Sequence, residues 1–196
     1  TLMKILSGVY TRDEGTMEIF GKSYDDLTPK QAQEAGVAII HQELNMCRHL
    51  TVTENMFLGR EVKGGLSLNN AKMRKEAKKV LDDLRIDISP DQIVGDLPVS
   101  KQQMVEIAKA LSINARILIM DEPTRGIDVG AKHEIYEIMN DLAAEGKAII
   151  MISSEMAELL GMSDRVYVMC NGKMRGELTE ENEMTQEHVM SYATKF

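Results

Sequence analysis

Residues 117–123, ILIMDEP, decide the fold of this chain. Four apolar residues run directly into two adjacent carboxylates, Asp121 and Glu122. A strand of a parallel sheet is buried on both faces and has a continuous apolar sequence. Ligands of such sheets bind beyond the carboxyl ends of the strands, which is where both acids stand. The stretch therefore predicts an acidic pair at the rim of a buried sheet. A strand followed by a solvated acidic turn is the alternative.

The residues around this stretch alternate between strand and helix patterns. Short apolar runs at 37–41, 147–152 and 165–170 predict strands. Apolar residues at helical spacing predict helices over 100–114 and 129–145. Strands that alternate with helices indicate an α/β fold with a parallel sheet.

Turn and cap signals mark the ends of several elements. Alternation around a glycine at 15–24 predicts a β-hairpin, and Asn-Gly at 171–172 predicts a second one. Serine or threonine followed three residues later by glutamate or glutamine forms a capping box. Such boxes at 28–31, 51–54 and 100–103 each predict a helix start.

Residues 43–97 form a mostly helical insert between two strand segments. Within this insert, residues 61–70 are expected to be a loop. Apolar residues between 73 and 84 fall on one face at helical spacing and predict a helix. Residues 87–97 are polar with a proline near each end, which is typical of a connector.

Composition restricts the class of protein. The chain of 196 residues has a formal charge of −8, which argues against a general nucleic-acid binder. Two distant cysteines, Cys47 and Cys170, are expected to be reduced thiols in a cytosolic protein. No apolar run is long enough to span a bilayer. The chain begins at Thr1 in the middle of a pattern, which we interpret as a truncated N-terminus.

The segment before the acidic pair, LPVSKQQMVEIAKAL at 97–111, resembles a known motif. It is similar to the signature segment of the ATP-binding cassette (ABC) ATPases, LSGGQ followed by QQxVxIAxAL. Its spacing to the Asp-Glu pair is also that of the family. Exposed N–H groups and the dipole at a helix start suit a phosphate. The resemblance implies that Ser100, Lys101 and Gln102 contact nucleotide. An amphipathic helix that matches by chance is the alternative.

Other motifs of the same family follow in order. Gln42, in IIHQEL, precedes the insert as the family's Q-loop glutamine does. The resemblance implies that Gln42 reaches the metal and the attacking water and links the site to the insert. Asp128, in RGIDVGAK, matches the D-loop aspartate at the contact between two cassettes. Residues 1–6 resemble the helix directly after the phosphate-binding loop, which places Thr1 beside the nucleotide phosphates.

The resemblance covers nearly the whole chain, 1–196, and identifies it as a partial ABC domain. It implies a P-loop-type parallel sheet with flanking helices and an inserted helical subdomain at 43–97, with the N-terminal strands missing. ATP and Mg²⁺ are the implied cofactors. Asp121 would bind the metal together with Gln42, and Glu122 would be the general base that activates water. The oxygen-rich pair suits Mg²⁺, which is usually held by carboxylates and phosphates.

The nearest resemblance is to ATPases of bacterial ribose, galactose and methyl-galactoside importers. It implies ATP hydrolysis coupled to sugar uptake at the cytoplasmic face of the bacterial inner membrane. The implied partners are transmembrane permease subunits, a second cassette, identical or different, and indirectly a periplasmic sugar-binding protein. Those ATPases carry two cassettes in one chain. Segments such as HQELN resemble the first cassette, and DEPTRGIDVGAK resembles the second, which predicts a hybrid joined near 121–124.

The sequence departs from the family pattern at four places. The phosphate-binding loop is absent, so we expect weak ATP binding. The central strand before that loop is also absent, which predicts exposed apolar surface and unpaired strand edges. Pro98 stands at the signature serine and offers neither a hydroxyl nor an N–H. Ser154 stands at the switch histidine and cannot carry its positive charge.

These departures leave other functions open. One alternative is a catalytically inactive interaction or regulatory module, and another is an incomplete gene fragment. A DNA-repair or translation ATPase of the same superfamily is disfavoured, because neither a long coiled-coil insert nor basic arms are visible.

Overall fold

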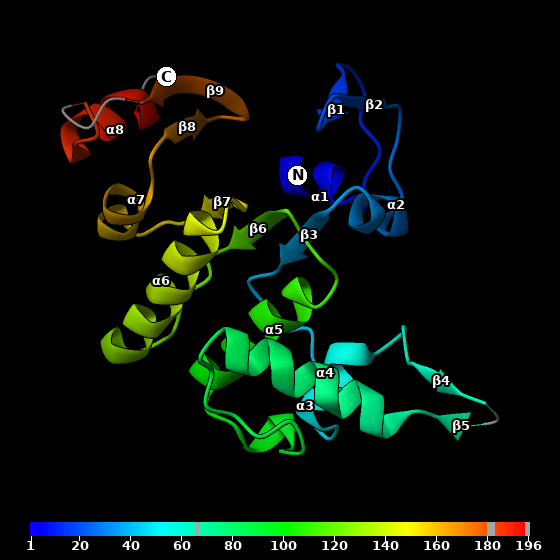
Figure 1. Cartoon of the computed structure of the whole chain (residues 1–196). Coiled ribbons are helices and arrows are strands. Elements are labelled where there is room, and N and C mark those ends of the chain that lie inside the picture. Colours follow the sequence, from blue (N-terminus) through cyan, green and yellow to red (C-terminus); the bar gives the residue numbers. More distant parts are fainter. Residues whose placement is uncertain (66, 180–182, 195–196) are drawn as a thin grey trace. The chain divides into compact units, whose positions relative to one another are not determined.

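The computed structural model describes residues 1–65, 67–179 and 183–194, and its contacts divide the chain into two units, Thr1–Ile152 and Ser153–Phe196. The first unit contains a three-stranded parallel sheet in the order β3-β6-β7 (Figure 1). The predicted α/β class with a parallel sheet is confirmed.

The elements of the first unit are, in chain order, α1 (Leu2–Leu6), β1 (Met17–Ile19), β2 (Lys22–Tyr24), α2 (Pro29–Glu34), β3 (Val37–Ile40), α3 (Val52–Phe57), β4 (Lys63–Gly64), β5 (Ser67–Leu68), α4 (Asn70–Asp83), the 3-10 helix η1 (Val94–Asp96), α5 (Val99–Leu111), β6 (Ile117–Asp121), α6 (Val129–Ala144) and β7 (Ala148–Ile152).

Strands β3 and β6 are packed on both of their faces. Val37 and Ile119 join a core cluster with Met17 and Ile19 of the β1–β2 hairpin, and α1 and α2 also contribute to this cluster. Their sequence neighbours point to the opposite face because side chains alternate along a strand. Leu118 on that second face is fully buried, and α5 contacts β3. Burial on both faces explains why these strands are apolar throughout.

Strand β7 is apolar as well and, like β3, it lies at an edge of the sheet. It pairs with β6 on one side, from Ile117 opposite Ala148 to Asp121 opposite Ile152. Among the described residues, no strand pairs with its other side. Ala148 and Ile150 are exposed, although α6 contacts the strand. Strand β7 therefore presents apolar side chains and an unpaired backbone edge.

Two of the three predicted capping boxes are confirmed. The Thr28 hydroxyl accepts a hydrogen bond from the Gln31 amide, and Gln31 closes the box at the start of α2. Thr51 and Glu54 form the same arrangement at the start of α3. The hydrogen bonds that Glu54 receives from Thr51 lower the pKa of the Glu54 carboxyl below its usual value.

The capping box predicted at 100–103 is wrong. Helix α5 begins at Val99, its N-cap is Pro98, and no side chain caps it. The ring of Pro98 holds its φ at −56°, so the chain passes from extended backbone into the helix at this residue. Ser100 consequently lies inside the first turn, where its hydroxyl cannot act as the N-cap.

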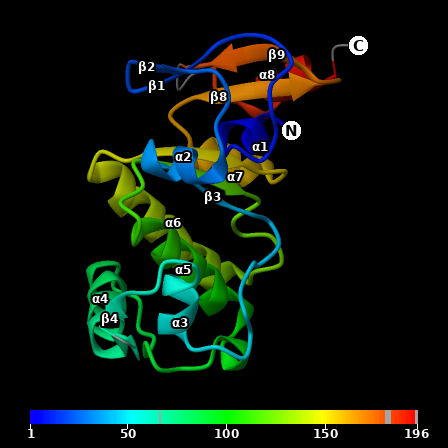
Figure 2. The ribbon, with the colours of Figure 1, turned by 90° about the vertical axis from the view of Figure 1, so that its right-hand side faces the viewer.

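Residues 43–97 contain α3, α4, η1 and a short hairpin, β4–β5, none of which joins the parallel sheet (Figures 1 and 2). The hairpin corrects the expected loop at 61–70, where Lys63 pairs with Leu68. Arg60 links this region to α5: its guanidinium donates to the Ser112 carbonyl and hydroxyl and to the Met56 carbonyl. Burial lowers the pKa of this guanidinium.

The second unit is built around an antiparallel hairpin. Its elements are α7 (Met156–Met162), β8 (Val166–Cys170), β9 (Lys173–Leu178) and α8 (Gln186–Ala193). The Asn-Gly turn at 171–172 joins the two strands, as predicted, and both residues have positive φ angles. Val166, Val168, Leu178 and Val189 form the core of this unit.

Among the described residues, no helix combines the length and the apolar character that crossing a bilayer requires.

Candidate functional site

The structure brings Gln42 and the acidic pair to the same edge of the sheet. Strands β3 and β6 are parallel neighbours, with Ile40 opposite Met120. Asp121 is the last residue of β6, Glu122 follows it, and Gln42 lies two residues beyond Ile40. The carboxyl ends of adjacent parallel strands therefore deliver one amide and two carboxylates to one rim. This is the rim where α/β sheets bind ligands.

Glu122 has an unusual backbone. Its φ is +51°, in the left-handed region that non-glycine residues rarely adopt. Its amide donates to the Ile152 carbonyl at 2.8 Å, and its carbonyl accepts from the Arg125 amide at 3.2 Å. These bonds hold the turn immediately after β6. Strained backbone of this kind concentrates at functional sites, where the surrounding structure fixes a side chain in a particular direction.

The turn after Glu122 ends at a helix cap. Thr124 is buried, and its carbonyl accepts a hydrogen bond from the Ile127 amide at 3.1 Å. The Asp128 carboxylate then accepts from the Ala131 amide at 3.0 Å and forms the N-cap of α6. Asp128, predicted as a nucleotide-binding residue at the contact between two cassettes, thus has a local role in starting this helix.

The three residues predicted to contact nucleotide from α5 lie in its first turn, and two have partners within the chain. The Lys101 ammonium forms an ion pair with Glu134 of α6 at 3.0 Å. Gln102 is buried, and its amide donates to the Leu97 carbonyl at 2.8 Å. Ser100 is half-buried. Because Gln102 points inward, it supports the loop before the helix.

The two remaining predicted residues are Thr1 and Ser154. Thr1 is exposed and precedes α1, whose start no side chain caps. Ser154 is exposed and belongs to the second unit. Its neighbour Ser153 donates a hydrogen bond to the buried Glu158.

The donor atoms at the rim suit Mg²⁺. Asp121 and Gln42 offer oxygen ligands, which this hard cation prefers, and Mg²⁺ is commonly held by one or two carboxylates plus substrate phosphates. The described residues contain no cluster of three or more histidine, cysteine or acidic side chains that would hold a metal by itself. The arrangement therefore fits an ion that a bound phosphate group helps to hold.

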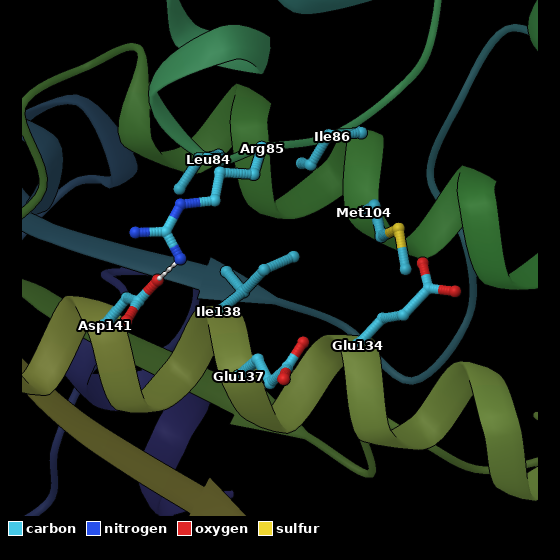
Figure 3. Close-up of a pocket in the computed structure, with 8 residues that line it drawn as sticks. All are labelled: Leu84, Arg85, Ile86, Met104, Glu134, Glu137, Ile138 and Asp141. Carbon is cyan, nitrogen blue, oxygen red and sulfur yellow. Dashed lines mark ion pairs between the residues drawn. The ribbon is translucent and has the colours of Figure 1, made fainter.

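A pocket of about 90 Å³ lies elsewhere in the first unit, between α5, α6 and the turn after α4 (Figure 3). Met104 and Ile138 contribute apolar surface to it, and Arg85 pairs with Asp141 across it at 3.4 Å. None of the predicted site residues lines this pocket. It is therefore separate from the rim that carries Gln42 and Glu122.

Sequence reasoning missed the buried Asn55. This residue of α3 is 0% exposed, and its side chain binds the backbone of the segment that follows Gln42. An asparagine in the middle of a helical pattern is the signal that could have revealed it, because such a side chain must find polar partners when buried.

The comparisons with known proteins agree with the geometry. The family model described as "ABC transporter" matches residues 1–125. A protein of Burkholderia lata, named as a ribose/galactose/methyl galactoside import ATP-binding protein, is 47% identical over 175 residues, covering 88% of this chain and 34% of its own length. The ribose import ATP-binding protein RbsA 2 of Escherichia coli O157:H7 is 43% identical over 182 residues, covering 93% and 36%.

Solved structures show the same fold. The ADP conformation of MJ1267, an ATP-binding cassette of an ABC transporter, is 25% identical and superimposes with a TM-score of 0.83 over 99% of this chain and 82% of its own. A nucleotide-free ATP-binding cassette is 26% identical, with a TM-score of 0.82 over 97% and 78%.

The chain spans about a third of the length of the curated relatives it matches. The matched family model extends from α1 past the acidic pair, and so includes the segment of Gln42 and the signature-like helix. The sequence motifs, the sheet and the comparisons thus lead to one conclusion: the chain belongs to the ABC transporter family and has the fold of its ATP-binding cassettes.

Proposed function

We propose that the protein is the ATP-binding subunit of a bacterial sugar importer, in which ATP hydrolysis drives uptake. One observation carries this proposal: Gln42, Asp121 and Glu122 all lie at the carboxyl ends of two paired parallel strands. The names of the relatives, which are sugar import ATP-binding proteins, support the choice of cargo.

The residues at the rim have different roles in hydrolysis. Glu122 acts as the general base: its carboxylate takes a proton from water as the water oxygen bonds to the γ-phosphorus and the bond to ADP breaks. The constrained backbone of Glu122 fixes where that carboxylate points. Gln42 orients the same water and links the site to residues 43–97. Positioning of this kind is the main source of catalysis in phosphoryl transfer.

Asp121 and Gln42 hold Mg²⁺ in this proposal. When bound, the ion neutralises charge on the phosphate oxygens. ATP lies against this rim, and Thr1 is a further contact to its phosphates. Ser154 is a proposed nucleotide contact of the second unit. Ser100, Lys101 and Asp128 face the nucleotide held by a second cassette, identical or different, and the buried Gln102 supports the loop before α5.

We propose that residues 1–196 form one partial cassette domain with an inserted helical subdomain at 43–97, and the proposed partners follow from this division. That subdomain docks on cytoplasmic loops of transmembrane permease subunits, and a periplasmic sugar-binding protein delivers the sugar from the other side. The protein therefore works at the cytoplasmic face of the inner membrane.

Phosphate release from MgATP tests this proposal. The wild-type protein is compared with Glu122→Gln, which keeps the shape of the side chain but cannot accept a proton. We expect turnover to fall by a factor of about 100 or more, as loss of a general base does. Glu145→Gln, an exposed change near the end of α6, is the control and should retain full turnover. Turnover that is equal in all three proteins would refute the assignment of Glu122.

A second candidate function is a catalytically inactive interaction module. Two observations favour it: Pro98 caps α5 without a side-chain hydrogen bond, and the exposed Ser154 stands where the family has histidine. Nucleotide binding without turnover in wild type would support this alternative. Pro98→Ser together with Ser154→His should then restore turnover if these two positions are what blocks it.

A further inference from the structure

The segment that carries Gln42 has little regular structure but is firmly attached at its far end. Residues 41–50 connect β3 to α3, and a turn near 48–50 is their main local feature. Gln42 and Glu43 are exposed. A connector of this composition would be mobile unless side chains or a neighbouring backbone held it. Three groups from the rest of the first unit hold it.

The first group is the side chain of Asn55. Its Oδ1 accepts a hydrogen bond from the Cys47 amide at 2.8 Å. Its Nδ2 donates to the Cys47 carbonyl at 3.0 Å and to the Leu50 carbonyl at 3.3 Å, and also to the Thr51 carbonyl at 3.0 Å. Asn55 is 0% exposed, and the backbone groups that it binds belong to half-buried residues. Loss of such a side chain leaves these backbone groups without partners, which is costly.

The second group is the backbone around Gly95. The Gly95 amide donates to the Arg48 carbonyl at 2.7 Å, and the neighbouring Val94 amide donates to the Leu50 carbonyl at 3.0 Å. A Cβ at position 95 would lie 2.7 Å from the Arg48 oxygen, which is too close for any side chain. Glycine is therefore needed here for the close approach of two backbones.

The third group is Lys109 of α5, whose ammonium donates to the Asn45 carbonyl at 3.4 Å. The three groups contact positions 45, 47, 48 and 50 and belong to α3, η1 and α5. The far half of the segment is thus bound to the helices around the insert, while Gln42 stands at the rim of the sheet.

We propose that Asn55 is a positioning residue for Gln42. It fixes Cys47 to α3, and only five peptide units separate Cys47 from Gln42, at most about 18 Å of extended chain. Asn55 therefore limits how far Gln42 can move, because the connector between the two is short and is anchored at its far end. This inference rests on the proposed function for its catalytic consequence, but the anchoring itself can be measured separately.

Amide hydrogen exchange measures the anchoring. Asn55→Ala is compared with Thr53→Val, a matched control in the same helix. Thr53 is also buried, and its hydroxyl donates to the Pro90 carbonyl at 2.9 Å, away from the segment. We expect amides at 46–50 to exchange about tenfold faster or more in Asn55→Ala and to be unchanged in Thr53→Val. Equal exchange in both variants would overturn the proposal.

A second variant displaces the same segment without touching Asn55. Gly95→Ala should press on the Arg48 carbonyl and raise exchange over 46–50 in the same way. Gly161→Ala is its control, because the added Cβ meets no atom within 4 Å and the residue lies in α7. If Asn55→Ala does not fold, as judged by thermal unfolding, this pair decides the question.

ATP turnover separates a positioning role from a purely structural one. We expect Asn55→Ala to lower kcat about tenfold with KM for ATP unchanged, while Thr53→Val keeps both. Faster exchange with unchanged kcat would show an anchor without a positioning role and would overturn the proposal. If Glu122→Gln also leaves turnover unchanged, the proposed hydrolysis fails instead, and the exchange result still stands by itself.

Discussion

Strands β6 and β7 are neighbours with almost the same kind of sequence but very different surroundings. Ile119 of β6 and Ile150 of β7 are opposite one another in the parallel register. Ile119 is 0% exposed, whereas Ile150 is 37% exposed. An apolar run therefore predicts a strand, but its burial depends on what pairs with it and packs on it. The stability of the sheet should rest mainly on the β3–β6 half.

Truncating the two opposed isoleucines offers the largest test of this comparison. Ile119→Ala should lower the free energy of unfolding by about 4 kcal/mol, because it removes buried surface and leaves a cavity. Ile150→Ala removes the same atoms from a partly solvated site and should cost about 1 kcal/mol. Urea unfolding of both variants measures the difference. Equal losses would mean that β7 is as well packed as β6.

A substitution directly after β6 should have a smaller effect on the free energy of unfolding, and of opposite sign. Glu122→Gly should raise the free energy of unfolding by about 1 kcal/mol, because glycine adopts the φ of +51° without strain. Glu122→Ala is the control, since it removes the carboxylate but keeps the strained backbone. Both variants should lose ATP turnover. A destabilised glycine variant would show that the Glu122 side chain holds the turn.

The caps of the helices add a contribution that does not depend on the sheet. Thr51→Ala removes the capping box of α3 and should cost about 1 kcal/mol. Thr11→Ala, at an exposed site in an irregular segment, is a control for loss of a threonine hydroxyl away from any helix start. Urea unfolding again measures both, and a loss confined to Thr51→Ala would show that the cap is responsible.

The smallest expected effect is a loss of stability at low pH. It comes from the helix cap, and the strands of the sheet should not contribute to it. The pKa of Glu54 is lowered in the folded protein by its hydrogen bonds with Thr51. Its contribution to stability is therefore complete above the unfolded pKa and is lost as pH falls through the folded pKa. Because Glu54 is almost fully solvated, the loss should be a few tenths of a kcal/mol. Glu54→Gln should flatten this part of the profile of stability against pH.

Much of the fold was predictable because its signals are local. The apolar runs predicted β3, β6 and β7, and the Asn-Gly pair predicted the turn between β8 and β9. The cap at Ser100 was wrong because Pro98 starts α5 two residues earlier. The β4–β5 hairpin was missed because two strands of two residues each are too short to show alternation.

The rim was predictable only in part. The rule that parallel strands present ligands at their carboxyl ends places Gln42 beside Asp121 and Glu122, and the register agrees. The left-handed backbone of Glu122 was not predictable, because tertiary packing rather than residue type imposes it. The role of Asn55 was also hidden, since its partners are backbone atoms that only the folded chain brings near.

The open side of β7 has a practical consequence for anyone who purifies this protein. Residues 148–152 are five uncharged apolar residues, and no other strand of the described residues pairs with the side of β7 that faces away from β6. Such segments template the precipitation of other chains, and crowded solutions favour it. Dilute storage and the substitution Ile150→Lys should both slow precipitation during storage, because each opposes pairing along this edge.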